Sequence, residues 1–233
     1  MSTFKPRDWG SHAPYIAPGY KSTLLRGPTQ APLAIKSGLT EGTGPRFAPA
    51  SVRELDFDLT KNGVVNGEPL GERIVVHGRV MDTDGRPQPN TLVEIWQANA
   101  AGRYVHKVDQ RDAPLDPNFR GSGRCFTDDQ GNYEFYTIKP GAYPWGNHFN
   151  AWRPNHIHIS LFGPGFATRL VTQMYFPGDP LLDLDPIFLG TEDAQARERL
   201  IAKFSIDKTE EGFALGYQFD IVLRGRNGTP MEN

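Results

Sequence analysis

One stretch of the sequence decides how the rest is interpreted: Tyr143-Pro144-Trp145-Gly146-Asn147-His148-Phe149-Asn150-Ala151-Trp152-Arg153-Pro154-Asn155-His156-Ile157-His158. His156 and His158 stand two positions apart in it. Side chains alternate between the two faces of a strand, so on a strand both imidazoles would share a face and could bind one metal ion. Tyr143 stands in a proline-containing turn just upstream, within reach of the same point. The stretch therefore predicts a strand with a candidate metal site on one face.

The histidine pair alone leaves the metal open, because two histidines on a strand face are also common as surface or core residues. A site of two histidines and one carboxylate needs a nearby acid, and the first acid after His158 is Asp179. A zinc site would need further cysteines or histidines, but Cys125 is the single cysteine and no histidine follows His158. Tyrosines surround the stretch, and a phenol with a pKa near ~10 binds best to a hard trivalent ion. The residues therefore favour non-haem Fe(III).

The composition of the chain favours a protein rich in turns and short strands and argues against a nucleic-acid-binding or membrane-spanning protein. The chain of 233 residues contains 25 glycines and 20 prolines, which indicates many turns and short strands. A net charge of −2 gives no basic field for nucleic acid or an anionic membrane. We expect no membrane span, since no apolar run approaches ~20 residues, and no signal peptide. The single cysteine excludes an internal disulfide and indicates a cytoplasmic protein.

Outward from this stretch, segments of β-branched and alternating apolar residues between turn signals predict strands. They cover residues 73–83, 91–97, 124–128, 133–138, 156–162, 169–175 and 213–223. Residues 98–123 predict a long loop, a place where function often resides. Residues 191–204 predict the one helix, with Thr191 as its cap and Leu200, Ile201 and Phe204 as its apolar stripe. We therefore expect a mainly β fold: a β-sandwich core with long loops and one late helix.

The N-terminal region has a different character. Seven prolines stand in the first fifty residues, without sustained periodicity. A disordered tail is one interpretation, but apolar residues such as Tyr15 and Ile16 favour an arm that lies on a surface. We therefore divide the chain into residues 1–70, an extended proline-rich arm that packs on the core or on a partner, and residues 71–233, a β-sandwich catalytic domain.

Several segments of the chain resemble the intradiol ring-cleaving dioxygenases, and together they span most of its length. They are Gly71-Glu72-Arg73, residues 93–99, Gly102-Arg103-Tyr104, residues 115–119, residues 140–145, residues 152–158 and residues 219–225. The ordered set of two tyrosines and His-x-His is specific to that family. Catechol 1,2-dioxygenases share the site but carry a helical N-terminal domain. The proline-rich arm of this chain is closer to the catalytic subunits of the protocatechuate branch.

The resemblance implies a complete site. It makes Tyr104, Tyr143, His156 and His158 the four protein ligands of non-haem Fe(III). The family's active-site arginine corresponds to Arg153, and its glutamine in the pocket corresponds to Gln173. Two more residues match substrate contacts: Trp145 as a wall of the pocket, and Tyr20 as an arm residue that reaches the substrate. Asn155 departs from the small residue expected before the first ligand histidine, but its side chain should point away from the metal face.

The resemblance also implies the reaction: cleavage of protocatechuate (3,4-dihydroxybenzoate) with O₂ to 3-carboxy-cis,cis-muconate. In the family, the tyrosine matched by Tyr143 leaves the metal and takes a substrate proton, while the one matched by Tyr104 stays bound. Arg153 and Gln173 would stabilise the charge that develops, and a related alpha subunit would complete a hetero-oligomer. The alternatives are an intradiol dioxygenase for another catechol and a non-catalytic β-sandwich subunit. The remaining histidines receive no role: His12, His77, His106 and His148.

Overall fold

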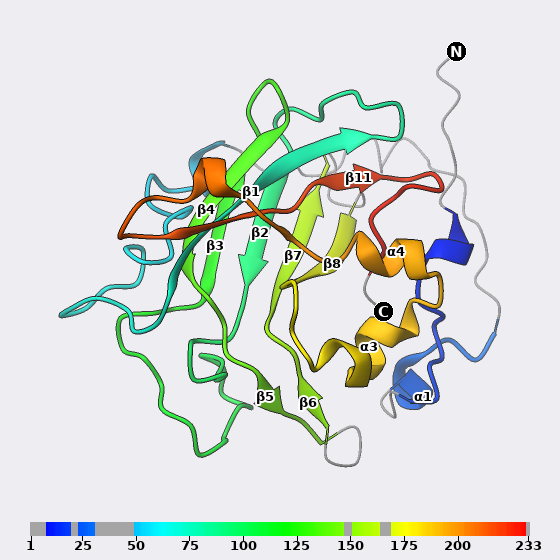
Figure 1. Ribbon diagram of the computed structural model, residues 1–233, viewed down its shortest axis with the longest axis horizontal. Coiled ribbons are helices and arrows are strands. Elements are labelled where there is room, and N and C mark those ends of the chain that lie inside the picture. Colours follow the sequence, from blue (N-terminus) through cyan, green and yellow to red (C-terminus); the bar gives the residue numbers. More distant parts are fainter. Residues whose placement is uncertain (1–7, 20–22, 31–48, 147–150, 164–168, 232–233) are drawn as a thin grey trace.

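The computed structural model describes residues 8–19, 23–30, 49–146, 151–163 and 169–231. Two sheets pack face to face in it (Figure 1). The first sheet is built around β1 (Arg73–Asp82), which pairs antiparallel with β4 (Asn132–Ile138). On its other edge, β1 pairs in parallel with β10 (Leu215–Gln218) and then with β11 (Ile221–Leu223), and β10 also pairs with β9 (Lys203–Phe204).

The second sheet is antiparallel and has the order β3 (Ser122–Phe126), β2 (Leu92–Trp96), β7 (His156–Phe162), β8 (Arg169–Tyr175). Inward-facing residues of both sheets form one core, which includes Val76, Phe135, Ile95, Ile157 and Met174. Burying this shared apolar surface holds the sheets together. The predicted mainly β fold with a sandwich core is therefore confirmed, and so are the long loop before β3 and the six strands predicted between residues 73 and 175.

The predicted final strand, residues 213–223, is wrong as one continuous element. Phe213 lies in a turn, and Phe219 and Asp220 interrupt the remaining segment between β10 and β11. The carboxylate of Asp220 accepts the hydrogen bond of the Arg79 backbone N–H at 3.0 Å. The ladder with β1 breaks there, because a side chain has taken the place of a backbone acceptor.

The predicted helix over residues 191–204 is also wrong in extent. Within this range only α4 (Ala194–Glu198) is an α-helix, and Lys203–Phe204 form β9. Another short helix, α3 (Pro186–Gly190), precedes the range, and Thr191 is its C-cap. Asp193 is the cap of α4, with its Oδ1 3.0 Å from the N of Ala196. The following apolar residues leave the helix because the backbone of residues 200–202 hydrogen-bonds to Tyr175 at the edge of β8.

The remaining elements are short. The arm contributes η1 (Trp9–Ser11) and α1 (Thr23–Arg26), and the other single turns are η2 (Pro49–Ser51), η3 (Leu182–Leu184) and η4 (Ile206–Lys208). A two-stranded ribbon of β5 (Tyr143–Pro144) and β6 (Trp152–Arg153) projects beyond the sheets, with α3 nearby (Figure 1). Leu59 is fully buried in the shared core. The division of the chain at residue 70 stays a prediction. Within the described ranges, no helix is long and apolar enough to cross a membrane.

Candidate metal centre

Strand β7 gives two histidines a common face. Ile157 is 0% exposed in the core, so alternation places His156 and His158 on the outer face, with ring centroids 4.9 Å apart. His156 Nδ1 lies 2.7 Å from the carbonyl oxygen of Pro154. A carbonyl oxygen only accepts, so Nδ1 carries the hydrogen and Nε2 keeps a free lone pair. Burial, with the nearby Arg153 charge and His158, lowers the pKa of His156 well below its usual value and keeps the imidazole neutral.

Trp96 supports the second histidine from the neighbouring strand. It stands opposite His158 in the β2–β7 register, and the two rings stack with centroids 4.8 Å apart and planes 3° from parallel. The contact fixes the orientation of the imidazole plane. Sequence reasoning missed this role, although the alternation of β2 already places Trp96 on the face away from the core.

Two tyrosines approach the histidines from outside the sheet. Tyr143 Oη lies 3.3 Å from His156 Nε2, and Tyr104 Oη lies 3.4 Å from the same atom. The two phenol rings meet edge to face with centroids 5.5 Å apart. Tyr143 is held in the ribbon, where it pairs with Arg153, while Tyr104 stands in the long loop between β2 and β3. The structure therefore brings together all four of the residues predicted to bind a metal.

The loop around Tyr104 is fixed by side chains that bond to its backbone. Asp109 accepts the Tyr104 N–H at 2.9 Å, and Asn99 accepts the N–H groups of residues 101 and 103 at 3.0 and 2.9 Å. Arg111 pairs with Asp109 and donates to the carbonyl oxygen of Gly102. Gly102 has a φ of 72°, and a Cβ there would lie 2.3 Å from the oxygen of residue 142. Only glycine therefore allows the close approach between loop and ribbon.

The groups around Tyr143 shift the pKa of its phenol in opposite directions. Burial raises the pKa of its phenol above the usual value, and Asp185 adds to that shift. The Arg153 charge, a hydrogen bond from Tyr104 and the Arg111 charge act in the opposite direction. The guanidinium carbon of Arg111 lies 5.0 Å from the centroid of the Tyr143 ring. Without a bound cation, the Tyr143 phenol therefore keeps its proton at neutral pH.

Arg153, Gln173 and Trp145 line the same side of the centre. Arg153 and Gln173 are each 3% exposed, and the guanidinium donates from Nη2 to Gln173 Oε1. Gln173 stands opposite His158 in the β7–β8 register, and its Nε2 has no hydrogen-bond partner in the described part of the chain. The Arg153 guanidinium lies 5.4 Å from the Trp145 ring centroid. Tyr20, the fourth predicted substrate contact, lies outside the described residues.

Two further residues of this region were missed because they are distant in sequence. The carboxylate of Asp185 lies 3.1 Å from Arg153 Nε, and Tyr175 Oη lies 3.3 Å from Arg153 Nη2. The Asp-Pro sequence at 185–186 is a helix-start signal, but nothing in it points to an arginine 32 residues earlier in the chain.

Three other histidines, His12, His77 and His106, make contacts outside this cluster. His12 accepts the backbone N–H of Met231 at 2.8 Å, and His77 belongs to β1 in the opposite sheet. His106 is exposed and accepts the N–H of Val108. His148 lies outside the described residues.

The donor set can be compared with the chemistry of metal ions. Among the described residues, no group of three or more His, Cys, Asp and Glu side chains could hold a metal ion. The cluster around His156 instead mixes two imidazoles with two phenols. A phenol binds a metal after losing its proton, and burial makes that loss harder for Tyr143. A strongly acidic trivalent ion can displace such a proton, so these residues fit Fe(III).

Comparisons with known proteins identify the family of this chain. A family model described as dioxygenase matches residues 42–225. A second model, the N-terminal part of the protocatechuate 3,4-dioxygenase beta subunit, matches residues 6–37. Together the two matches cover the arm and the sandwich.

Individual relatives give the same result. The chain is 68% identical to the protocatechuate 3,4-dioxygenase beta chain of Burkholderia cepacia over 97% of this chain and 96% of that one. It is 32% identical to the protocatechuate 3,4-dioxygenase alpha chain of Pseudomonas putida over 72% of this chain and 79% of that one. Hydroxyquinol 1,2-dioxygenase from Pseudomonas putida DLL-E4 has the same fold, with a TM-score of 0.55 and 22% identity over 93% of this chain and 73% of that structure. The chain belongs to the intradiol ring-cleaving dioxygenase family.

Proposed function

We propose that this chain is the iron-binding catalytic subunit of an enzyme that cleaves protocatechuate with O₂ to 3-carboxy-cis,cis-muconate. The observation that carries the proposal is the convergence of Tyr104 Oη and Tyr143 Oη on His156 Nε2, within 3.4 Å, beside the ring of His158. The choice of substrate is supported by the name of the Burkholderia cepacia relative, which is 68% identical over nearly the whole chain.

Tyr104, Tyr143, His156 and His158 would hold non-haem Fe(III). When bound, ferric iron supplies the Lewis acidity that favours ionised phenols and withdraws electron density from a catechol. The contact of His156 Nδ1 with the carbonyl oxygen of Pro154 orients Nε2 as a metal donor.

The two tyrosines have different tasks in the proposal. Tyr104 is tied to its loop through the bond of its N–H to Asp109, so it stays in place as a ligand. Tyr143 stands in a ribbon whose described strands pair over two residues each, followed by one backbone bond from Trp145 N to the Ala151 carbonyl oxygen. Its buried phenolate is a strong base, since burial raises the pKa of this group. Tyr143 Oη therefore takes a proton from a substrate hydroxyl as the substrate arrives.

Arg153 and Gln173 would act on the substrate ring. A guanidinium that is 3% exposed acts in surroundings of low dielectric, where it stabilises developing negative charge strongly. The Nε2 of Gln173, which has no hydrogen-bond partner among the described residues, is a second donor beside it. Trp145 forms a wall of the pocket, and Tyr20 from the arm contacts the substrate.

The proposal includes O₂ as co-substrate and a related alpha-type chain as partner in a hetero-oligomer. The alpha chain of Pseudomonas putida is itself a relative of this chain. Several large apolar side chains of the arm are exposed and available for such a partner to cover: Trp9, Tyr15, Leu24 and Leu25. The cytoplasm is the proposed location, in keeping with a single free cysteine, Cys125.

The test is O₂ uptake by the chain purified together with its alpha-type partner, with protocatechuate, catechol and hydroxyquinol as separate substrates. We expect the fastest uptake with protocatechuate and 3-carboxy-cis,cis-muconate as the product identified by NMR. Faster turnover of a catechol without a carboxylate would replace the proposed substrate. No ring cleavage with any catechol, despite bound iron, would favour the non-catalytic subunit.

A further inference from the structure

Asp185 is a buried carboxylate that the proposed reaction does not use. It is 0% exposed and follows η3 directly. Its oxygens lie 3.1 and 3.2 Å from Arg153 Nε, and the two side chains are 4% and 0% exposed. A guanidinium buried this deeply needs a counter-ion, because an unpaired charge away from water costs several kcal/mol. Asp185 supplies that counter-ion.

The carboxylate is itself held in place by the fold. Asp185 is the N-cap of α3, and its Oδ1 accepts the N–H of Ile187 at 3.2 Å. Its own N–H donates to the carbonyl oxygen of Leu182 at 3.3 Å. Backbone hydrogen bonds to residues before and after Asp185 therefore fix the position of its carboxylate. The carboxylate in turn fixes the position of the Arg153 guanidinium.

The guanidinium nitrogens of Arg153 differ in their contacts: two of them bond to neighbouring side chains, and the third is left for a ligand. Nε faces Asp185, while Nη2 donates to Gln173 Oε1 and lies 3.3 Å from Tyr175 Oη. Tyr175 Oη also lies 3.0 Å from Gln173 Oε1 and 3.4 Å from Asp185 Oδ2. Among the described residues, Nη1 makes no hydrogen bond. One edge of the planar guanidinium is thus anchored, and the remaining nitrogen stays available for a ligand.

We propose that Asp185 is the positioning residue of Arg153, which it holds through Nε so that Nη1 meets the negative charge that develops on the substrate. The inference rests on the function proposed above. Among the described residues, Asp185 makes no hydrogen bond to any of the four proposed metal donors, Tyr104, Tyr143, His156 and His158, and its charge reaches Tyr143 only through space. Its removal therefore leaves the metal donors in their positions.

The first variant is Asp185→Asn, which keeps the volume and the helix cap but removes the charge. We expect kcat to fall by about 10–100-fold, the effect of misplacing a catalytic group by about 1 Å. The KM for the catechol, the iron content and the visible absorption of the iron site should stay close to those of the wild type. Asp193→Asn is the matched control, since Asp193 caps α4 in the same way without a contact to Arg153. We expect it to leave kcat unchanged.

A double variant separates positioning from a general structural role. If Asp185 acts only through Arg153, Asp185→Asn should lower kcat no further in an Arg153→Gln background. A full additional loss there would overturn the proposal. Tyr175→Phe is a second variant, which removes one hydrogen bond to Arg153 and leaves the charges of Arg153 and Asp185 in place. We expect it to lower kcat about three- to tenfold, as for one lost hydrogen bond. Wild-type kcat in both Asp185→Asn and Tyr175→Phe would also overturn the proposal.

A crystal structure of Asp185→Asn supplies a readout that does not depend on turnover. We expect the Arg153 guanidinium to leave its anchored position while Tyr104, Tyr143, His156 and His158 stay in theirs. A guanidinium unmoved in that structure would overturn the positioning role whatever the substrate of the enzyme. Failure of wild-type protein to cleave any catechol, with Arg153 displaced in the variant, would instead overturn the proposed function alone.

Discussion

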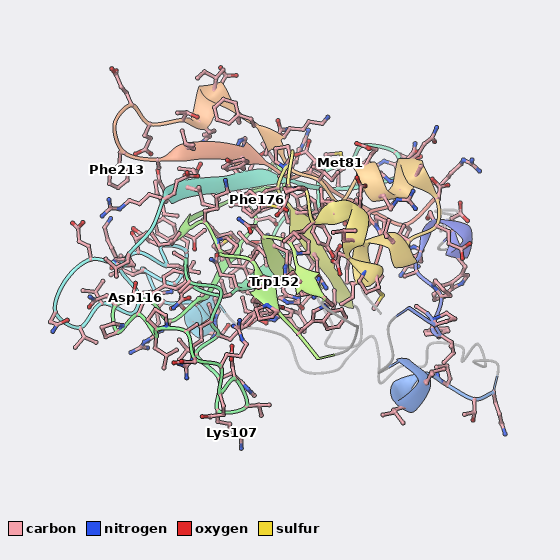
Figure 2. The ribbon with its side chains drawn as sticks, turned by 60° about the horizontal axis from the view of Figure 1, so that its bottom comes forward. Met81, Lys107, Asp116, Trp152, Phe176 and Phe213 are labelled. Carbon is pink, nitrogen blue, oxygen red and sulfur yellow. The ribbon has the colours of Figure 1, made fainter. Side chains whose placement is uncertain are left out.

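The two halves of the candidate metal centre are held in different ways. His156 and His158 stand on β7, where His158 is paired with both β2 and β8 and His156 is paired with β8. Tyr104 stands in a long loop, where Asp109 bonds to its backbone. Figure 2 shows that this loop extends outward, with Lys107 at its outer end. The strand half is thus a product of strand register, and the loop half depends on single polar side chains.

The largest effect is expected in the strand half. His158→Ala removes an imidazole that no other described residue replaces, so we expect loss of bound iron and more than a 100-fold loss of turnover, beyond the 10–100-fold typical of outer partners. Iron analysis by mass spectrometry measures the first effect. His106→Ala, an exposed histidine two residues after Tyr104, is the control and should retain iron. Equal iron loss in both variants would contradict the assignment.

Tyr143→Phe tests the separate tasks of the two tyrosines. We expect iron to stay bound through the other three residues, while kcat falls about 10²–10⁴-fold because the phenol that accepts the substrate proton is absent. Steady-state kinetics and iron analysis together measure this. Tyr136→Phe is the control, since that phenol on β4 bonds to Glu210, away from the centre. Wild-type turnover in Tyr143→Phe would remove the proton-accepting role.

Asp109→Asn weakens the loop half without touching a metal donor. Burial alone would raise the pKa of Asp109, but its bonds to Arg111 and to the Tyr104 N–H lower it overall. Its stabilising contribution is therefore complete above the usual value near 3.8 and is lost as the pH falls through the lower folded value. At neutral pH we expect about a tenfold loss of iron affinity, measured by competition with a chelator.

Asp128→Asn is the control for this loop variant. Asp128 accepts two backbone N–H groups in the hairpin before β4, with similar geometry and no contact to the centre. If both substitutions changed iron affinity alike, the loop would have no special part in holding Tyr104.

The smallest effect is expected at Trp96, which supports the strand half by packing. Trp96→Leu removes the stack on His158 and should lower the free energy of unfolding by about 1 kcal/mol, with iron retained. Chemical denaturation measures the change. Trp152→Leu is the matched control, because that ring is 45% exposed and should contribute less. Loss of iron in Trp96→Leu would mean that the stack, and not strand register, fixes His158.

The comparison also explains what the sequence could predict. Alternation along β7 depends on local residues alone, so the shared face of His156 and His158 could be predicted from spacing. Tyr104 could be assigned only through resemblance to a family, because its place depends on bonds from Asn99 and Asp109 within an irregular loop. Sequence periodicity reveals helices and strands, whose backbone hydrogen bonds follow a regular pattern. It does not reveal the side-chain contacts that hold an irregular loop.

The failures have the same origin. The break at Asp220 arises from its bond to the Arg79 N–H, 141 residues away in the chain. The early end of α4 arises from pairing of residues 200–202 with Tyr175. The Asp185–Arg153 pair joins a helix cap to a ribbon. Each depends on tertiary contacts that compete with a local preference, so local pattern alone could not predict them.

The most direct test of the central claim is the visible absorption spectrum of the purified protein, before and after anaerobic addition of protocatechuate. Tyrosinate bound to Fe(III) should give a red-brown colour through a broad charge-transfer band, and the substrate should shift that band. Both results are predicted if the strand and loop halves meet at one ferric ion. A protein that stays colourless after ferric iron is supplied would contradict the account.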